Sequence, residues 1–159
     1  MESTQFTLGT IDTVAARVLG LLESAGQETQ ATVLALHGNL GAGKTTFTQA
    51  LARALGVTDT VTSPTFVVRK DYETTHPLWS QLLHFDMYRI ESLAELAPLR
   101  FADALMQPAT LVVVEWAERI HEALPPLQTV HCQLTHNQET AESTLETITT
   151  AAAALIAYE

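Results

Sequence analysis

The sequence predicts an α/β protein whose mixed sheet has a parallel core and antiparallel additions. Three observations lead to this prediction. Apolar segments of strand length alternate with amphipathic segments of helix length. The apolar run 32–37 leads directly into a glycine-rich turn, and the most apolar strand-like run covers 111–115. Polar stretches between strand-like segments in the middle and at the end of the chain favour hairpins, which add antiparallel strands.

The first half of the chain contains two predicted helices with the strand 32–37 between them. Residues 11–25 carry apolar side chains at helical spacing, and Thr10 or Asp12 can cap the start of this helix. Residues 44–55 are helical again, and Gly56 is the predicted residue at which that helix ends.

The middle of the chain predicts a hairpin followed by a broken helix. Residues 66–72 and 81–88 have the pattern of strands, and the polar segment 73–80 between them has the composition of a hairpin loop. Residues 92–105 are mostly helical in pattern, with an interruption at Pro98, because proline cannot donate the helical hydrogen bond.

The end of the chain predicts two further strands and a helix. Beyond the strand 111–115, residues 130–134 alternate between apolar and polar side chains, as on a half-buried strand. A turn around Asn137 leads to a predicted strand over 144–148, and an alanine-rich terminal helix that includes 151–157 follows.

Length and charge limit the classes of function. The 159 residues fit one domain spanning 1–159, without repeat or linker. Eighteen acidic and eight basic residues give a formal net charge of −10, which disfavours a broad surface for nucleic acid or anionic membranes. Cys132 is the single cysteine, and the chain start lacks the basic and apolar regions of a secretion signal, so we expect a cytoplasmic protein.

A phosphate-binding loop is the strongest motif in the sequence. Residues 38–45 read GNLGAGKT and match the pattern Gly-x-x-x-x-Gly-Lys-Thr between a strand and a helix. Glycines allow consecutive backbone N–H groups to point at a phosphate, and the helix adds the positive end of its dipole. Lys44 can neutralise the β- and γ-phosphates, and Thr45 can offer its hydroxyl to Mg²⁺. The motif predicts nucleoside triphosphate binding by a three-layer domain of the P-loop NTPase kind.

Two acidic residues at predicted strand ends can complete such a site. Glu115 follows the run LVVV, where P-loop proteins place the acid that holds Mg²⁺ or orients water. Asp86 ends LLHFD, and its pattern fits a turn cap as well as a catalytic acid. Thr65 fits a mobile switch threonine or an ordinary turn fixed by proline. Trp116 fits stacking on a base or partner, or simple packing.

Other classes of site are disfavoured by absent patterns. The six histidines lack metal-ligand spacing, and one cysteine builds no zinc site. The guanine-selecting pattern Asn-Lys-x-Asp is missing, which favours adenine.

Two alternative functions remain. A small-molecule P-loop kinase usually has an arginine-rich lid, whereas the second half of this chain has only Arg89, Arg100 and Arg119. A non-catalytic ATP-dependent interaction module is the other alternative.

Four segments together resemble a known family. They are GNLGAGKTTF at 38–47, SPTF at 63–66, HFDMYRI at 84–90 and VVVEWAERI at 112–120. In this order and at these separations they are similar to the TsaE (YjeE) family, small bacterial P-loop ATPases required for making threonylcarbamoyladenosine at position 37 of tRNA. The resemblance runs over most of residues 6–135.

The resemblance implies a role for individual residues. It implies catalytic functions for Lys44, Thr65, Asp86 and Glu115, and it makes Thr45 and Glu115 the ligands of Mg²⁺. Which of the two acids holds the ion and which orients water stays open. The predicted ATP-binding residues are Thr13, Asn39, Leu40, Gly41, Ala42, Gly43, Lys44, Thr45, Thr46 and Trp116.

The resemblance also implies partners. The family acts on a complex of TsaD, the carbamoyl-transferring subunit, with TsaB, and its ATP hydrolysis resets that complex without transferring the group itself. We expect slow hydrolysis without partners and a monomer in isolation. The chain departs from the family in two places, because 136–147 lacks a Gly-x-x-Arg-like stretch and 93–103 lacks a glycine common there. No Lys or Arg follows Arg119, so we expect the partners to supply most of the charge that binds tRNA.

Overall fold

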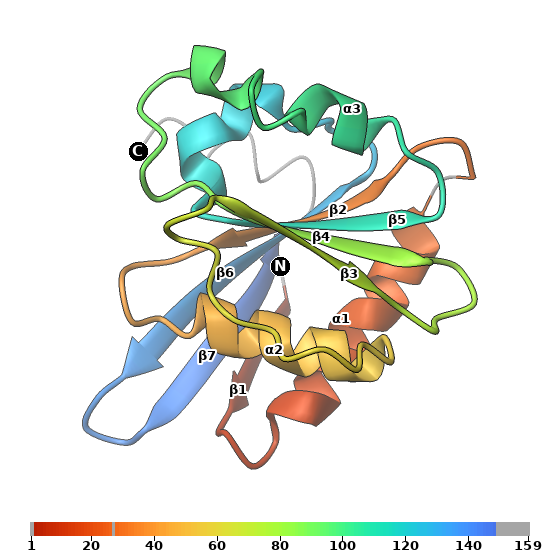
Figure 1. Cartoon of the computed structure of the whole chain (residues 1–159). Coiled ribbons are helices and arrows are strands. Elements are labelled where there is room, and N and C mark those ends of the chain that lie inside the picture. Colours follow the sequence, from red (N-terminus) through yellow and green to blue (C-terminus); the bar gives the residue numbers. More distant parts are fainter. Residues whose placement is uncertain (1, 27, 149–159) are drawn as a thin grey trace.

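The computed structural model describes residues 2–26 and 28–148, which form one seven-stranded sheet with helices on both faces (Figure 1). The strands are β1 (Glu2–Phe6), β2 (Thr32–His37), β3 (Arg69–Glu73), β4 (Gln81–Asp86), β5 (Thr110–Glu115), β6 (Thr129–Asn137) and β7 (Glu142–Ile148). Their order across the sheet is β1-β7-β6-β2-β5-β4-β3.

The sheet has a parallel centre and antiparallel edges. Strand β2 runs parallel to both β5 and β6, and β4 runs parallel to β5. Strand β3 is antiparallel to β4, while β7 pairs antiparallel with both β6 and β1. Every residue of β2 and β5 is buried, as expected for parallel strands covered on both faces. The predicted fold class is therefore confirmed.

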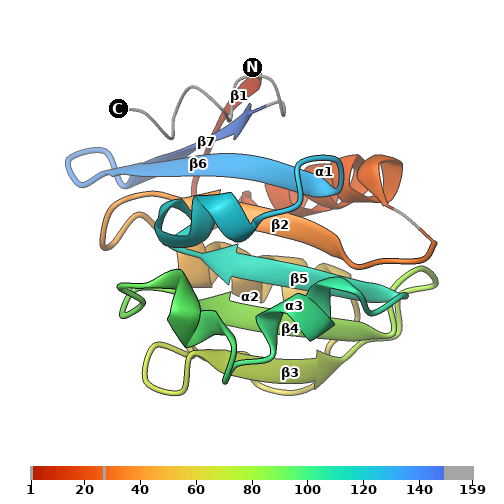
Figure 2. The ribbon, with the colours of Figure 1, turned by 90° about the horizontal axis from the view of Figure 1, so that it is seen from above.

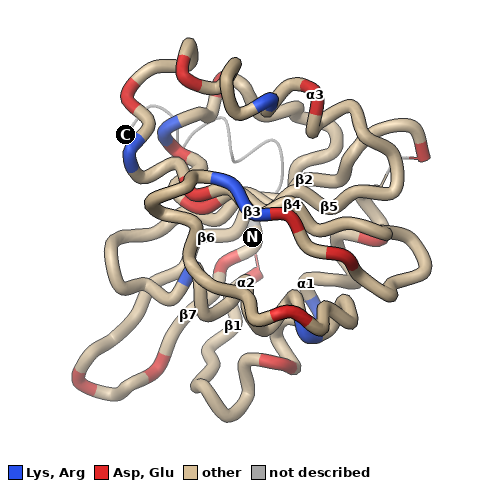
Figure 3. Tube along the Cα trace, viewed as in Figure 1, with Lys and Arg blue, Asp and Glu red and all other residues tan. Residues whose placement is uncertain are grey.

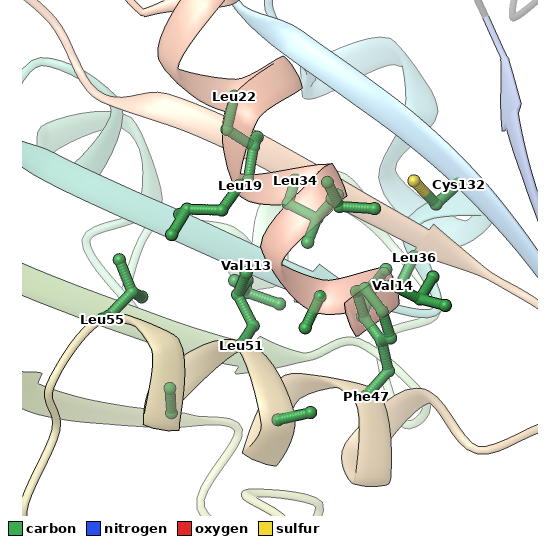
Figure 4. Close-up of a cluster of buried hydrophobic side chains, with 14 of the residues drawn as sticks. Val14, Leu19, Leu22, Leu34, Leu36, Phe47, Leu51, Leu55, Val113 and Cys132 are labelled. Carbon is green, nitrogen blue, oxygen red and sulfur yellow. The ribbon is translucent and has the colours of Figure 1, made fainter. Parts of the chain in front are cut away.

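Helices α1 (Ile11–Ala25) and α2 (Lys44–Ala54) pack on one face of the sheet. Alternate side chains of the central strands, including Leu34, Leu36 and Val113, meet the apolar sides of these helices in one hydrophobic cluster. Figure 4 shows this cluster, with Leu51 of α2 beside Val113 of β5. The period of two along each strand directs the intervening side chains to the other face.

The opposite face carries α3 (Phe101–Leu105) and two 3₁₀ helices, η1 (Leu93–Leu96) and η2 (Ala117–Ala123) (Figure 2). A second cluster there joins Val112 and Val114 of β5 to Phe101 and Ile120. No helix of the described residues is both long and apolar enough to cross a membrane.

Most predicted elements occur, with shifts at their ends. The predicted strand 66–72 begins only at Arg69, because the N–H groups of Val67 and Val68 donate to the carbonyl of Pro64 in a turn. Strand β4 ends at Asp86 instead of residue 88, since the Asp86 side chain accepts the backbone N–H of Tyr88 and turns the chain.

The observed helix ends can also be compared with the predicted ones. Thr10 occupies the predicted cap position before α1, but its hydroxyl oxygen accepts the N–H of Thr7 at 3.0 Å and accepts no helical N–H. Asp12 lies in the first turn and pairs with Arg53 at 2.7 Å. Gly56 follows α2 with φ of +76°, the left-handed conformation expected after a helix.

The remaining comparisons concern the second half and the two chain ends. The helical segment 92–105 divides into η1 and α3 on either side of Pro98, as predicted. Strand β7 begins at Glu142, two residues before its predicted start. Strand β1 is not predicted from the sequence, because only Phe6 of its five residues is buried. The predicted alanine-rich terminal helix lies outside the described residues.

Candidate nucleotide-binding site

The glycine-rich segment forms a loop between the carboxyl end of β2 and the start of α2. Gly38 has φ of +142°, and a Cβ atom there would lie 2.5 Å from the carbonyl oxygen of Leu134. Gly43 has φ of +94° immediately before the helix begins at Lys44. Both backbone conformations are unfavourable for residues with a side chain, which explains why the loop requires glycine here. The N-terminus of α2 consequently opens towards the loop, where a helix stabilises an anion.

Lys44 lies inside this loop and is only 5% exposed. Its ammonium group donates to the backbone carbonyl oxygens of Gly38 at 2.5 Å and Asn39 at 2.9 Å. It also lies 3.9 Å from the ring centroid of Trp116, a cation–π distance. Burial lowers the pKa of Lys44, although the nearby carboxylates, first that of Glu115, oppose the shift. The loop thus holds a cation at the place where a phosphate would need one.

Glu115 ends β5 beneath the start of α2 and is almost fully buried. The hydroxyl of Thr45 lies 2.9 Å from Oε1 and 3.0 Å from Oε2 of its carboxylate. His84 Nε2 lies 2.7 Å from the same Oε1 atom. A hydroxyl and a carboxylate in contact provide the hard oxygen ligands that Mg²⁺ prefers.

Asp86 ends the neighbouring strand β4 in a different setting. Its Oδ2 atom accepts a hydrogen bond of 2.6 Å from the Thr65 hydroxyl, which itself lies 2.6 Å from the Ser63 hydroxyl. Its Oδ1 atom accepts the backbone N–H of Tyr88 at 2.9 Å. Asp86 therefore caps a turn, as one interpretation of the sequence predicted, and also reaches into the segment 63–65, while its role as a catalytic acid stays a prediction.

A pocket of about 340 Å³ brings these groups together. Its walls come from the phosphate loop, the segment around Thr65 and the ends of β4 and β5. The lining residues are Leu40, Gly41, Gly43, Lys44, Thr45, Thr46, Ser63, Thr65, Asp86, Tyr88, Glu115 and Trp116. All four predicted catalytic residues and both predicted metal ligands are among them.

Three predicted ATP-binding residues lie elsewhere. Thr13 is exposed on α1 and does not line this pocket. Asn39 and Ala42 line a smaller pocket of about 140 Å³ between the phosphate loop and the carboxyl end of β6. Leu40 and Gly41 belong to both pockets, so the loop forms a wall between them.

Trp116 closes the site with a strained backbone. Its φ of +57° is rare for a bulky side chain and turns the chain sharply after β5. The indole ring meets Tyr88 with 5.0 Å between ring centroids, so the two aromatic residues link the turns that follow β4 and β5. The strained turn places the ring over Lys44 instead of continuing the strand.

The chemistry of the pocket fits Mg–ATP. A buried ammonium and a helix N-terminus suit the phosphates, while Thr45 and Glu115 supply oxygen ligands for the ion. The described residues contain no group of three or more His, Cys, Asp or Glu that could hold a metal ion. A Mg²⁺ ion here would take its remaining ligands from phosphate oxygens and water.

Comparison with known proteins decides the family. The family model described as threonylcarbamoyl adenosine biosynthesis protein TsaE matches residues 12–145. The chain belongs to the TsaE family. The match begins inside α1 and ends inside β7, so it includes the whole candidate site.

Individual TsaE proteins show the same relationship. The chain is 45% identical over 94 residues to the tRNA threonylcarbamoyladenosine biosynthesis protein TsaE of Bacillus subtilis, covering 58% of this chain and 55% of that protein. It is 39% identical over 92 residues to the Synechocystis protein of the same name, covering 56% of each chain. The chain thus spans a little over half the length of these two relatives.

Two further comparisons cover more of the molecule. The Rickettsia typhi protein of the same name is 36% identical over 109 residues, 67% of this chain and 72% of that protein. The crystal structure of Bacillus subtilis YdiB superposes with a TM-score of 0.61 and 28% identity, covering 91% of this chain and 83% of that chain.

The sequence pattern alone missed three residues of this TsaE site. Ser63 and Tyr88 line the pocket, and His84 contacts Glu115 from the neighbouring strand β4. A signal for His84 was present, because it precedes Asp86 by two positions on one strand and must share its face. What the pattern lacked was the identity of the neighbouring strand, which brings Glu115 within reach.

Proposed function

We propose that this protein is a Mg²⁺-dependent ATPase of the bacterial machinery that makes threonylcarbamoyladenosine in tRNA. The convergence of Lys44, Thr45, Asp86 and Glu115 on one pocket carries the proposal. Family membership supports the pathway, because the relatives are named for threonylcarbamoyladenosine biosynthesis. The reaction is phosphoryl transfer from ATP to water.

Each residue has a task in this chemistry. Lys44 and the N–H groups of the loop bind the phosphates and offset charge on the γ-phosphoryl oxygens. Thr45 and Glu115 are the residues that would hold Mg²⁺, which neutralises phosphate charge when bound. Asp86 orients the attacking water, and Thr65 connects this carboxylate to the partly exposed segment before β3. Transfer of the threonylcarbamoyl group lies outside this site.

The partners in this proposal are TsaD and TsaB. Phe66, next to Thr65, is 83% exposed, and Leu40 and Tyr88 are exposed apolar residues of the same rim. An uncovered rim of this kind suits a protein partner that completes the site. Figure 3 shows two basic residues that are consecutive along the described trace only at the start of β3, whereas acidic residues are spread along it. This charge pattern suits a protein that leaves tRNA binding to the partner complex, and the proposal places it in the cytoplasm as a monomer when isolated.

The test compares ATP hydrolysis by the isolated chain with hydrolysis in the presence of purified TsaD and TsaB. We expect slow turnover alone and strong stimulation by the two partners. Lys44→Ala should lower ATP affinity by about 100-fold, because a charge-assisted contact to phosphate is lost. Lys70→Ala is the matched control, since Lys70 is the only other lysine and does not line the pocket.

Three results would contradict this proposal. Unchanged ATP affinity and turnover in Lys44→Ala would remove the site assignment. Bound ATP that stays intact through many rounds of tRNA modification would favour a non-catalytic module. Tight, salt-dependent tRNA binding by the isolated chain would contradict the assignment of tRNA contacts to the partners.

A further inference from the structure

We propose that His84 is a positioning residue that fixes the Glu115 carboxylate for Mg²⁺ binding. This inference rests on the proposed function, because it concerns how the same ATP site holds its metal-binding acid. His84 is fully buried, and its Nε2 atom lies 2.7 Å from Glu115 Oε1. Glu115 itself is 2% exposed, so water does not compete strongly for this contact.

The strand register brings the two side chains together. Strands β4 and β5 run parallel, with Asp86 opposite Glu115 and His84 opposite Val113. Because side chains alternate along a strand, His84, Asp86 and Glu115 all face the side that carries α2. The first turn of α2 presents Thr45 to the same carboxylate. His84 therefore approaches Glu115 from the sheet, whereas Thr45 approaches it from the helix.

The hydrogen bond to Glu115 explains why a histidine occupies this buried position of β4. Its neighbours along β4, Leu82 on the same face and Leu83 on the other, are buried apolar residues. Nδ1 of His84 has no hydrogen-bond partner among the described residues, so burial of this ring is unfavourable compared with a leucine. The bond to Glu115 is what a histidine adds here and an aliphatic side chain would lose.

The two anchors of Glu115 differ in what they do when the site is in use. The Thr45 hydroxyl is itself a proposed ligand of Mg²⁺, so its oxygen would serve the ion in addition to its contact with Glu115. His84 has no such second task and remains available to Oε1. Mutation of a residue that hydrogen-bonds to a metal ligand typically lowers metal affinity or activity by about 10–100-fold, because the partner orients the ligand and tunes its basicity.

The experiment compares two replacements of similar size at this position. His84→Leu removes the hydrogen bond, whereas His84→Gln keeps an N–H donor on a flexible side chain. ATP affinity is measured by calorimetry with and without Mg²⁺, together with turnover in the TsaD–TsaB mixture and the thermal midpoint. For His84→Leu we expect Mg²⁺-free affinity within about twofold of wild type, but the gain in affinity from Mg²⁺ and the turnover reduced about tenfold or more. His84→Gln should recover both to within about threefold.

A matched control separates this role from general loss of a buried histidine. His131→Leu makes the same change at another buried imidazole, on β6, and should leave the Mg²⁺ dependence of binding unchanged. His84→Phe is a second apolar variant in case His84→Leu does not fold.

Several outcomes would overturn the inference. Wild-type Mg²⁺ dependence and turnover in His84→Leu would do so while leaving the proposed function intact. Equal defects in the leucine and glutamine variants, or failure of both apolar variants to fold, would assign His84 a purely structural role. A wild-type protein that binds no ATP would overturn the proposed function, and this inference with it.

Discussion

The ends of β4 and β5 carry two carboxylates at the same register of the sheet, yet the two are held by different kinds of partner. Glu115 at the end of β5 accepts from a helix residue, Thr45, and from a buried strand residue, His84. Asp86 at the end of β4 accepts from Thr65, which belongs to a partly exposed loop. The comparison teaches that equivalent positions in neighbouring strands can be held in different ways, one by buried side chains of a strand and a helix and the other by a partly exposed loop.

The largest expected effect tests that difference directly. Glu115→Gln should weaken Mg–ATP binding relative to Mg²⁺-free ATP, and turnover should fall about 100-fold, because the carboxylate ligand is gone. Asp86→Asn should lose turnover to a similar degree but keep the Mg²⁺ dependence of binding. Calorimetry with and without Mg²⁺, combined with steady-state kinetics, distinguishes the two patterns. If both variants show the same Mg²⁺ dependence of ATP binding, the two acids do not have separate roles.

A smaller effect is expected at the loop that contacts Asp86. Thr65→Val should lower turnover about tenfold, since the hydroxyl joins the loop to the acid. In the Asp86→Asn background the same change should add little, because coupled residues do not contribute independently. Steady-state kinetics of the double-mutant cycle measures this coupling. Thr62→Val, in the same segment but outside the pocket, is the control, and full additivity of Thr65 and Asp86 would speak against a shared task.

Replacing the aromatic residue after β5 should affect ATP affinity more than replacing the one after β4. Trp116→Leu should lower ATP affinity about fivefold, because Lys44 loses a cation–π contact that keeps its ammonium group in the loop. Tyr88→Leu after β4 should change ATP affinity less, since Tyr88 meets the indole ring. Titration with ATP at low ionic strength compares the variants. A larger loss for Tyr88→Leu would reverse the expected ranking.

The smallest effect concerns stability and lies away from both acids. Burial lowers the pKa of His131 to about 4, helped by the neighbouring His37 and His121. Between about pH 6.5 and 4 the unfolded chain therefore binds a proton that the folded chain does not. The free energy of unfolding should consequently fall as the pH is lowered through this window, by about 1–2 kcal/mol between pH 7 and 5.

Urea denaturation at several pH values measures this pH dependence of the free energy of unfolding. His131→Gln should flatten the pH dependence, whereas His136→Gln, at an exposed position of the same strand, should not. An equal pH dependence in wild type and His131→Gln would assign the loss of stability to other groups.

The phosphate loop illustrates what local sequence can predict. The residues 38–45 identify both a backbone shape and its ligand class, because glycine conformations and the Lys-Thr pair act within a few residues of one another. The fully apolar run at 111–114 likewise predicts a strand buried on both faces, and β5 is one.

Edge strands and side-chain partners were harder to predict. Strand β1 carries one buried residue, Phe6, and depends on pairing with β7 at the other end of the chain. The turn at Val67 and Val68 overrides the β propensity of two valines, because both backbone N–H groups donate to Pro64. In each case a contact outside the local pattern decides the conformation.

By itself, the sequence determined the class of fold, the phosphate loop and the place of Glu115 at the end of its buried strand, since these depend on periodicity and on short spacings. Only the tertiary structure decided that β4 lies beside β5 and that α2 covers their ends. That placement gives Glu115 its partners Thr45 and His84, and gives Asp86 its partner Thr65. The physical reason is that strand neighbours are selected by the packing of the whole sheet between two layers of helices, whereas a sequence pattern reports only on residues close along the chain.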